Sequence, residues 1–502
     1  MNVILLMVDS LNRRYLSPYG AENSHTPNFA RLARKCVTMD QHWTGSLPTM
    51  PARHEIMAGR YDYLWRGWGP LEPFDVTLPA LCKPKGTVSQ LLTDTYHYFM
   101  EGSGNFHTDF DGWELLRGHE ADTWKTDPVE PLGVYKRMFK EKGDRAMRYV
   151  RNTYKFRDER DFFGPRLMQT AAEWIDNNFM QESFFCMIDS FDVHEPWHVP
   201  APYDKMFDPD FAGETVIWPT YGDASQYPEA EVKNMRAQYQ GKIAMFDKWL
   251  GLLLDRMDRY NLWDNTMFIL TTDHGVHLGE HGQLGKNQAP YYTILTQIPM
   301  FVWHPQMKLA SGSRCKALTS TIDIFPTVVE ALGLEVPQGY VYHGTSMMPL
   351  FNGEKDSIRE YAHTGYYGAG TVITDGKWVL HKFPNAQNQP LYSYGLRMER
   401  FHTRTVLEPY LKGEVGKHMP WTDAQVFKLK MAAPPAQGKS TLEIKEKLPT
   451  MLFDLDKGDS DLSLNVIEKH PETAERLRKA LAEEFRKIQA PEEQFVRLEL
   501  LD

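Results

Sequence analysis

Residues 46–60 read Ser-Leu-Pro-Thr-Met-Pro-Ala-Arg-His-Glu-Ile-Met-Ala-Gly-Arg, and the rest of the chain is organised around them. Pro51 is typical of the first turn of a helix, because its ring fixes φ and the N–H that it lacks would be unpaired there. Such a helix start directs backbone N–H groups and the positive end of the helix dipole toward an anion beside Thr49. Arg53, one turn later, can hold two oxygens of a phosphoryl or sulfuryl group. On this stretch alone, an ordinary helix with a surface arginine is the alternative interpretation.

Two apolar segments far apart in the chain end in residues that can bind a metal ion. The first opens the chain and ends at Asp9, and the second ends at Asp273-His274. Such runs are typical of strands buried on both faces of a parallel sheet, and ligands bind beyond the carboxyl ends of these strands. A threonine hydroxyl needs a metal or a base to become a nucleophile. We therefore predict Thr49 as the nucleophile and one divalent cation bound by Asp9, Thr49, Asp273 and His274. A histidine ligand favours Mn or Zn over Ca.

This combination resembles the sulfatase family of the alkaline phosphatase superfamily. The family signature is Cys/Ser-x-Pro-x-Arg followed by a Gly-Arg pair, which matches residues 49–53 and Gly59-Arg60 apart from the first position. Further matching segments follow in family order: residues 2–9, 26–28, 273–286, 321–327 and 452–455. The resemblance covers nearly the whole chain. It implies an α/β fold with an alkaline-phosphatase-like mixed sheet sandwiched by helices, followed by a smaller α+β domain.

The alternation of apolar strands and helices supports the same fold class. We place the catalytic domain at residues 1–350 and the smaller domain, with antiparallel strands and a closing helix, at residues 351–502. Residues 386–448 are expected to form a long irregular insertion that covers the pocket or makes a contact between the subunits of a homo-oligomer. Residues 118–160 are polar and rich in charge, and they are interpreted as surface excursions.

Thr49 departs from the family pattern in a way that bears on the reaction. Sulfatases carry Cys or Ser at this position and convert it to formylglycine, whereas the β-carbon of threonine carries a methyl group and cannot become that aldehyde. Threonine nucleophiles are usual in relatives that cleave phosphate diesters or transfer phosphoryl groups. The resemblance thus implies a metal-dependent hydrolase of phosphate diesters or phosphonate monoesters. A sulfatase that uses unmodified threonine and a non-catalytic anion-binding relative are the alternatives.

The resemblance also implies roles for a lysine and several histidines. Lys286 would bridge the nucleophile oxygen and the substrate anion. His194, which follows an apolar strand, would protonate the leaving group, since imidazole can donate a proton near neutral pH. A second metal ion bound by Asp192, His194 and His198 is less expected, because their spacing fits such a site poorly. Substrate contacts are expected from His97, Asn105, His107 and His198, with a structural role as the alternative for the histidines.

Composition limits the classes of partner. A net charge of −10 over 502 residues disfavours a nucleic-acid-binding surface. No run of 18 apolar residues is present, so no membrane span is expected. The start of the chain lacks a charged leader, which favours a cytoplasmic enzyme. The four cysteines show no Cys-x-x-Cys spacing, so neither a zinc ribbon nor a redox motif is indicated. The expected partner is a small anionic ester.

Overall fold

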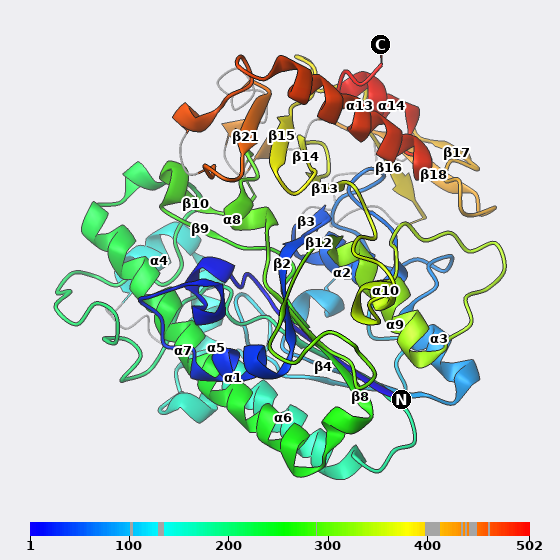
Figure 1. The fold of residues 1–502 in the computed structure, drawn as a ribbon. Coiled ribbons are helices and arrows are strands. Elements are labelled where there is room, and N and C mark those ends of the chain that lie inside the picture. The colour runs from blue at the N-terminus through cyan, green and yellow to red at the C-terminus, as the bar shows by residue number, and fades with distance from the viewer. Residues whose placement is uncertain are drawn as a thin grey trace.

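In the computed structural model, the chain forms a large mixed sheet with helices on both faces and a second, smaller sheet beside it (Figure 1). The structure describes residues 1–100, 104–128, 135–287, 289–396, 412–432, 435–436, 439–440, 449–459 and 462–501. The α/β sandwich that the sequence predicts is confirmed.

The large sheet is eight-stranded, in the order β12-β2-β11-β8-β1-β6-β4-β5. Strand β1 lies inside it, parallel to both β6 and β8, whereas β11 runs antiparallel to β8 and β2. Every residue of β1 is buried, as its apolar run predicts for a strand covered on both faces. The strands are β1 (Asn2–Val8), β2 (Val37–Trp43), β4 (Val88–Thr93), β5 (Gly112–Leu115), β6 (Phe184–Ser190), β8 (Thr266–Thr271), β11 (Met300–Trp303) and β12 (Arg314–Ser320).

Alternate side chains of β1 enter two separate hydrophobic cores, because successive side chains of a strand point to opposite faces. The even-numbered side chains pack with helices α1 (Pro27–Lys35), α6 (Phe163–Asn178) and α7 (Glu229–Arg259). The odd-numbered ones pack with α2 (Thr49–Ala58), α3 (Leu78–Lys85), α9 (Ile324–Leu332) and α10 (Met348–Phe351). The sheet is therefore sandwiched between two helical layers, and the carboxyl ends of its parallel strands meet at one edge.

The smaller sheet is five-stranded, in the order β21-β15-β14-β13-β3. Its edge strand β3 (Ser46–Leu47) comes from the N-terminal half of the chain and runs parallel to β13, so the residues just before Thr49 are tied to the C-terminal part. The other strands are β13 (Ala362–Tyr366), β14 (Thr371–Thr374), β15 (Trp378–Lys382) and β21 (Met451–Asp454). Helices α13 (Pro471–Lys487) and α14 (Glu492–Arg497) close this part of the molecule. The domain boundary near residue 350 stays a prediction.

The segment expected to be an irregular insertion instead carries two small antiparallel sheets in its described part. One has the order β16-β18-β17, with β16 (Tyr392–Gly395), β17 (Glu414–Gly416) and β18 (Val426–Lys430). The other pairs β19 (Pro435–Ala436) with β20 (Lys439–Ser440). Residues 397–411, 433–434, 437–438 and 441–448 of this segment lie outside the described residues.

Several shorter elements complete the fold. They are α4 (Lys136–Lys142), α5 (Asp144–Thr153), α8 (Thr293–Thr296) and the sheet of β7 (Gly222–Asp223), β10 (Gln283–Gly285) and β9 (His277–Leu278). Within the described ranges, the helices that are long enough to cross a bilayer are all too polar to do so.

Candidate active site

Thr49 opens helix α2 at the wall of a cavity of about 580 Å³. Pro51 lies in the first turn of this helix, as the sequence predicts. His194 and Lys286 line the same cavity. The structure thus brings together three of the four predicted catalytic residues around one space that can hold a small ester.

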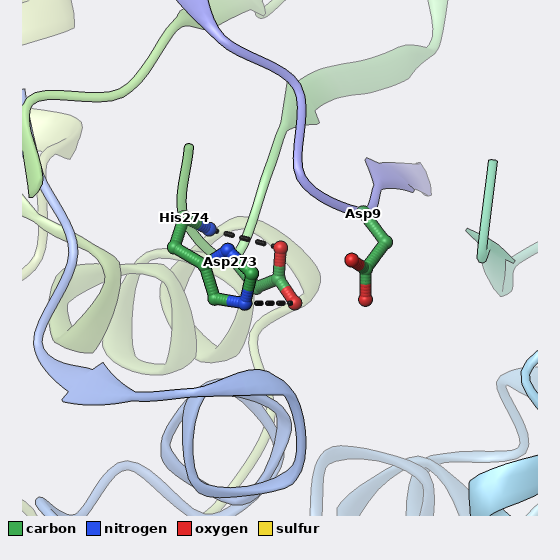
Figure 2. Close-up of side chains that lie close together, drawn as sticks. All are labelled: Asp9, Asp273 and His274. Carbon is green, nitrogen blue, oxygen red and sulfur yellow. Dashed lines mark hydrogen bonds and ion pairs between the residues drawn. The ribbon is translucent and has the colours of Figure 1, made fainter. Parts of the chain in front are cut away.

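Three of the four predicted protein ligands of the metal ion converge behind this cavity. Asp9 follows β1, and Asp273 and His274 follow the neighbouring parallel strand β8, so all three lie at the same edge of the sheet. One potential ligand atom from each residue lies within 4.8 Å of the others, and all three side chains are buried. Figure 2 shows the Asp273 and His274 side chains in contact, with Asp9 facing them.

The protonation state of His274 fits a bound cation. Its Nδ1 is 2.9 Å from the carbonyl oxygen of Gly275, which can only accept, so Nδ1 carries the proton and Nε2 has a lone pair. Nε2 lies 3.4 Å from Oδ2 of Asp273 and, among the described residues, has no hydrogen-bond partner. Burial lowers the pKa of His274, so the ring is neutral near pH 7. A lone pair that faces buried carboxylates is unfavourable without a cation between them, and this donor set suits a divalent metal.

Arg53 does not occupy the place predicted from the sequence. Its guanidinium is fully buried and donates to both oxygens of Asp189 at 2.9 and 2.8 Å, and to Oδ2 of Asp273 at 2.8 Å. Its Nη2 is also 3.0 Å from Oδ2 of Asp9. Buried carboxylates need a counter-charge, and Arg53 supplies it to three of them. In place of the expected contact with the substrate anion, Arg53 pairs with Asp189 and with two predicted metal ligands, Asp9 and Asp273.

Asp189, the acidic residue of β6, was not predicted from the sequence as a site residue. It belongs to an apolar strand that runs parallel to β1, so the rule that ligands gather at strand ends could have found it. Tyr98 donates a hydrogen bond to its Oδ2. Burial raises the pKa of Asp189 against the opposing effect of Arg53.

Lys286 connects the carboxylate cluster to the cavity through Ser10. Its Nζ donates to Oγ of Ser10 at 2.8 Å and lies 3.6 Å from Oδ1 of Asp9, while Ser10 Oγ donates to the same oxygen at 2.7 Å. Burial opposes ionisation of Asp9, but Lys286 and Arg53 together hold its pKa well below the usual range. Asp9 is therefore a carboxylate, as a metal ligand must be, and the ammonium group borders the space beside Thr49.

His194 is neutral in this structure rather than a ready proton donor. Its Nδ1 donates to the carbonyl oxygen of Glu195 at 2.6 Å, which leaves Nε2 as an acceptor. Burial lowers the pKa of His194 from 6.5 to about 4. The sequence predicts a proton donor near neutral pH, so this role needs an anion in the cavity that favours the charged form of the ring.

A model of the sulfatase family matches residues 1–334, about two thirds of the chain. The chain belongs to the sulfatase family. The multifunctional alkaline phosphatase superfamily protein PehA of Trinickia caryophylli is 26% identical over 423 residues, which cover 72% of this chain and 79% of that protein. Choline-sulfatase of Rhizobium meliloti is 23% identical over 412 residues, covering 75% and 77% respectively.

Solved structures support the same family fold. The phosphonate monoester hydrolase of Agrobacterium radiobacter superposes with a TM-score of 0.67 at 20% identity, covering 97% of this chain and 95% of that one. This likeness shows an alkaline-phosphatase-like fold. Together with the family match, it makes the chain an ester hydrolase of a metal-dependent superfamily.

The structure brings only one of the four predicted substrate contacts to the cavity of this sulfatase-family chain. His97 lines it and pairs with Glu120, at 3.4 Å between Nε2 and Oε2. Asn105 instead donates to the carbonyl oxygen of Leu71 at 3.2 Å. The sequence analysis could not separate these residues, because the local backbone sets which side chain faces inward: His97 lies in a short 3-10 helix, and Asn105 has a positive φ of 77°.

The two other predicted contacts lie in aromatic surroundings away from the cavity. The ring of His107 packs against Phe99 and Trp113, with centroids 4.5 and 4.9 Å apart. His198 is hydrogen-bonded to the hydroxyl of Tyr149 at 3.1 Å. These contacts agree with a structural role for the two histidines, the alternative to substrate binding.

A second metal site made of Asp192, His194 and His198 is also not assembled. Asp192 instead accepts from His119 at 2.8 Å and lies 2.6 Å from Nζ of Lys242. Asp94, His119 and Asp192 do cluster, but the lysine ammonium already compensates the Asp192 charge. Among the described residues, Asp9, Asp273 and His274 form the cluster that the sequence predicts, and the number of metal ions stays a prediction.

Many residues of the cavity wall were missed by the sequence analysis. Several come from α4, α5 and the loops beside them, within or just after the charge-rich stretch interpreted as surface excursions. No described residue of the 386–448 segment lines this cavity, so its expected role as a pocket cover is not supported there. The missed lining residues include Glu120, Lys142, Arg145, Arg148, Glu195, Trp218, Tyr221 and Asn287.

Proposed function

We propose that this chain hydrolyses phosphate diesters or phosphonate monoesters through a covalent intermediate on Thr49. The observation that carries the proposal is the position of Thr49, which opens α2 on the cavity wall shared with Lys286 and His194. Arg53 links it to the ligand cluster, because one guanidinium nitrogen donates to both the Thr49 carbonyl oxygen, at 3.1 Å, and Asp273. A threonine at this position cannot supply the aldehyde chemistry of formylglycine.

When held by Asp9, Asp273 and His274, a divalent cation supplies Lewis acidity that favours the alkoxide form of a nearby hydroxyl. The Thr49 oxygen attacks phosphorus, and the bond from phosphorus to the leaving oxygen breaks. The Lys286 ammonium and the N-terminus of α2 stabilise charge on the remaining phosphoryl oxygens. We favour Mn or Zn over Ca as the ion, because of the imidazole ligand.

His194 serves both half-reactions in this scheme. A bound anionic ester raises the pKa of His194, so the protonated ring donates its proton to the departing alkoxide. The neutral ring then accepts a proton from water as the water oxygen attacks phosphothreonine. The bond from phosphorus to the Thr49 oxygen breaks, which releases the product and returns the Thr49 alkoxide and the protonated ring. The low pKa of the free site suits the second step, in which the ring must act as a base.

The test compares the parent with Thr49→Ala and Thr49→Ser, each loaded with metal. We expect the parent and the serine variant to cleave bis(4-nitrophenyl) phosphate, and the alanine variant to lose roughly a thousandfold or more in kcat, as for other nucleophile deletions. Acid quenching followed by mass spectrometry should find phosphate on the peptide that contains Thr49. Equal turnover by Thr49→Ala would refute a covalent role.

The same assay separates the alternatives. Faster turnover of 4-nitrophenyl sulfate would favour a sulfatase that uses unmodified threonine, which the likeness to a choline-sulfatase makes the second candidate. Stoichiometric metal binding with no turnover of either ester would favour an anion-binding relative.

A further inference from the structure

The wall of the cavity formed by α4 and α5 carries three cationic side chains that the proposed reaction does not use. Lys142 ends α4, and Arg145 and Arg148 lie three residues apart on α5, so these two project from the same helix face. All three line the cavity that Thr49 borders. We call them the α4–α5 cations.

The α4–α5 cations are only partly compensated by the protein. Arg145 pairs with Glu120. The Lys142 ammonium donates to the carbonyl oxygen of Pro219 at 2.8 Å, and burial lowers its pKa. Arg148 is exposed, and within the described part of the chain no carboxylate pairs with it. An anion in the cavity would therefore meet the Arg148 guanidinium, with which no described carboxylate is paired.

The charged side chains of the whole cavity lining also favour an anionic ligand. Its lining holds four lysine and arginine side chains, counting Lys286, against the carboxylates of Glu120 and Glu195. The chain as a whole has a net charge of −10, so a local excess of cations is unusual for this protein. Lys286 lies beside Asp9, at the reaction centre, which leaves the α4–α5 cations for a different group of the ligand.

The size and the aromatic residues of the cavity fit a substrate larger than the reacting ester. The cavity volume of about 580 Å³ lies within the range of sites that enclose a drug-sized ligand. Trp218 lines the cavity, and its ring lies 5.5 Å from Nζ of Lys142 and 5.1 Å from Cζ of Arg145. Its position gives an apolar surface next to the cations, as a ring or sugar carrying a charged substituent would need.

We propose that the α4–α5 cations form a second anion subsite, which binds a carboxylate, sulfate or phosphate group remote from the reacting ester. This inference rests on the proposed function, because that function places the reacting ester at Thr49. Arginine side chains suit such groups, since the planar guanidinium can donate two parallel hydrogen bonds to them.

The experiment compares kcat/KM for 4-nitrophenyl phenylphosphonate with two carboxylated forms of it, one substituted on the phenyl ring and one on the nitrophenyl ring. The measured quantity is the preference for each carboxylated ester over the plain one, in the parent and in variants. Comparing the preference between proteins cancels the intrinsic reactivity of each ester. We expect Arg148→Ala to lower it about tenfold or more for at least one carboxylated ester, as for loss of a charge-assisted hydrogen bond.

Further variants sharpen the result. Arg148→Glu should lower the preference further, and Arg148→Lys should keep most of it. The control is Lys140→Ala, an exposed cation on α4 outside the cavity, which should leave the preference unchanged. A preference that changes less than twofold in Arg148→Ala and Arg148→Glu, for both carboxylated esters, overturns the proposal.

A binding measurement distinguishes failure of the subsite from failure of the proposed function. Calorimetry with phenylphosphonate and 4-carboxyphenylphosphonate needs no turnover. Tighter binding of the carboxylated compound that Arg148→Ala abolishes supports the subsite, even if Thr49→Ala shows that the reaction does not use Thr49. Equal binding of both compounds by the parent overturns the subsite and leaves the proposed function to its own test.

Discussion

The replacement of Arg53 by methionine distinguishes two roles for this residue that predict opposite results. Methionine keeps much of the side-chain length and removes the charge. In the structure, the guanidinium makes three hydrogen bonds of 2.8 to 2.9 Å to Asp189 and Asp273, and all of these side chains are fully buried. The variant therefore leaves buried carboxylates without their main counter-charge, whereas a substrate-binding arginine would leave stability unchanged.

The expected loss of stability follows from these contacts. Removing one partner of a buried ion pair costs roughly 3–5 kcal/mol, because the other charge stays buried and unpaired. Each charge-assisted hydrogen bond contributes about 1.5–3 kcal/mol, so three of them could exceed that range. The pKa of Asp189 is already raised by burial, and proton uptake there relieves part of the cost. We expect the free energy of unfolding of the metal-free protein to fall by about 3–5 kcal/mol, a large fraction of a typical total.

The assay is urea unfolding at pH 7 in the presence of a chelator, followed by circular dichroism. A double-mutant cycle with Asp189→Asn should show that the double variant is destabilised less than the sum of the single variants, by about 1–3 kcal/mol. Arg34→Met, at an exposed position of α1, is the control and should change stability by at most about 0.5 kcal/mol. If Arg53→Met unfolds like the parent and only raises KM, the guanidinium contacts the substrate and the argument is refuted.

Three further predictions concern proton transfer, pH and the metal. His194→Ala should lower kcat for alkyl esters by about 100-fold or more and affect 4-nitrophenyl esters much less, because nitrophenolate leaves without a proton; an equal loss for both classes would contradict its role as proton donor. Burial lowers the pKa of His381 from 6.5 to about 4, and neither ring nitrogen has a hydrogen-bond partner among the described residues. As the pH falls, the unfolded chain takes up a proton at His381 before the folded protein does. The contribution of neutral His381 to the free energy of unfolding is therefore complete above pH 6.5 and is lost as the pH falls toward 4. In denaturant titrations, lowering the pH from 8 to 5 should therefore reduce the free energy of unfolding of the parent by about 2 kcal/mol more than that of His381→Phe. A difference between the two proteins that is the same at both pH values would contradict this. Mn or Zn at 100 times its dissociation constant should stabilise the chelator-treated parent by about 2.7 kcal/mol; Asp273→Asn should abolish this gain, and an unchanged gain in that variant would place the ion elsewhere.

The fold and the convergence of three candidate metal ligands were predictable because they follow from local patterns. The apolar run that ends at Asp9 predicts a strand buried on both faces, and parallel strands bring their carboxyl ends to one edge. That rule alone places Asp9 beside Asp273 and His274. Pro51 likewise predicts where α2 begins, and hence where Thr49 lies relative to the helix dipole.

The partners of Arg53 could not be predicted in the same way. The sequence shows an arginine one turn after a candidate nucleophile, but its partners Asp189 and Asp273 lie 136 and 220 residues away. Only the packing of β6 beside β1 decides that buried carboxylates, and not the substrate, receive the guanidinium. The α4–α5 wall was misinterpreted for a related reason, because charged residues that line a cavity have the same composition as charged residues on a solvated surface.

The charges at the centre bear on which esters the site can hold. The buried carboxylates of Asp9, Asp189 and Asp273 exceed the cations Arg53 and Lys286 by one negative charge, and a divalent ion would turn this into one positive charge. A net charge in a buried site is costly, so a ligand with a single negative charge fits best.

Phosphate diesters, phosphonate monoesters and sulfate monoesters all carry one negative charge at neutral pH, whereas phosphate monoesters carry close to two. Charge therefore selects monoanionic esters but does not separate phosphorus from sulfur, and that choice depends on the attacking group. Because position 49 offers a hydroxyl that cannot become an aldehyde, we keep the phosphorus esters as the proposed substrates.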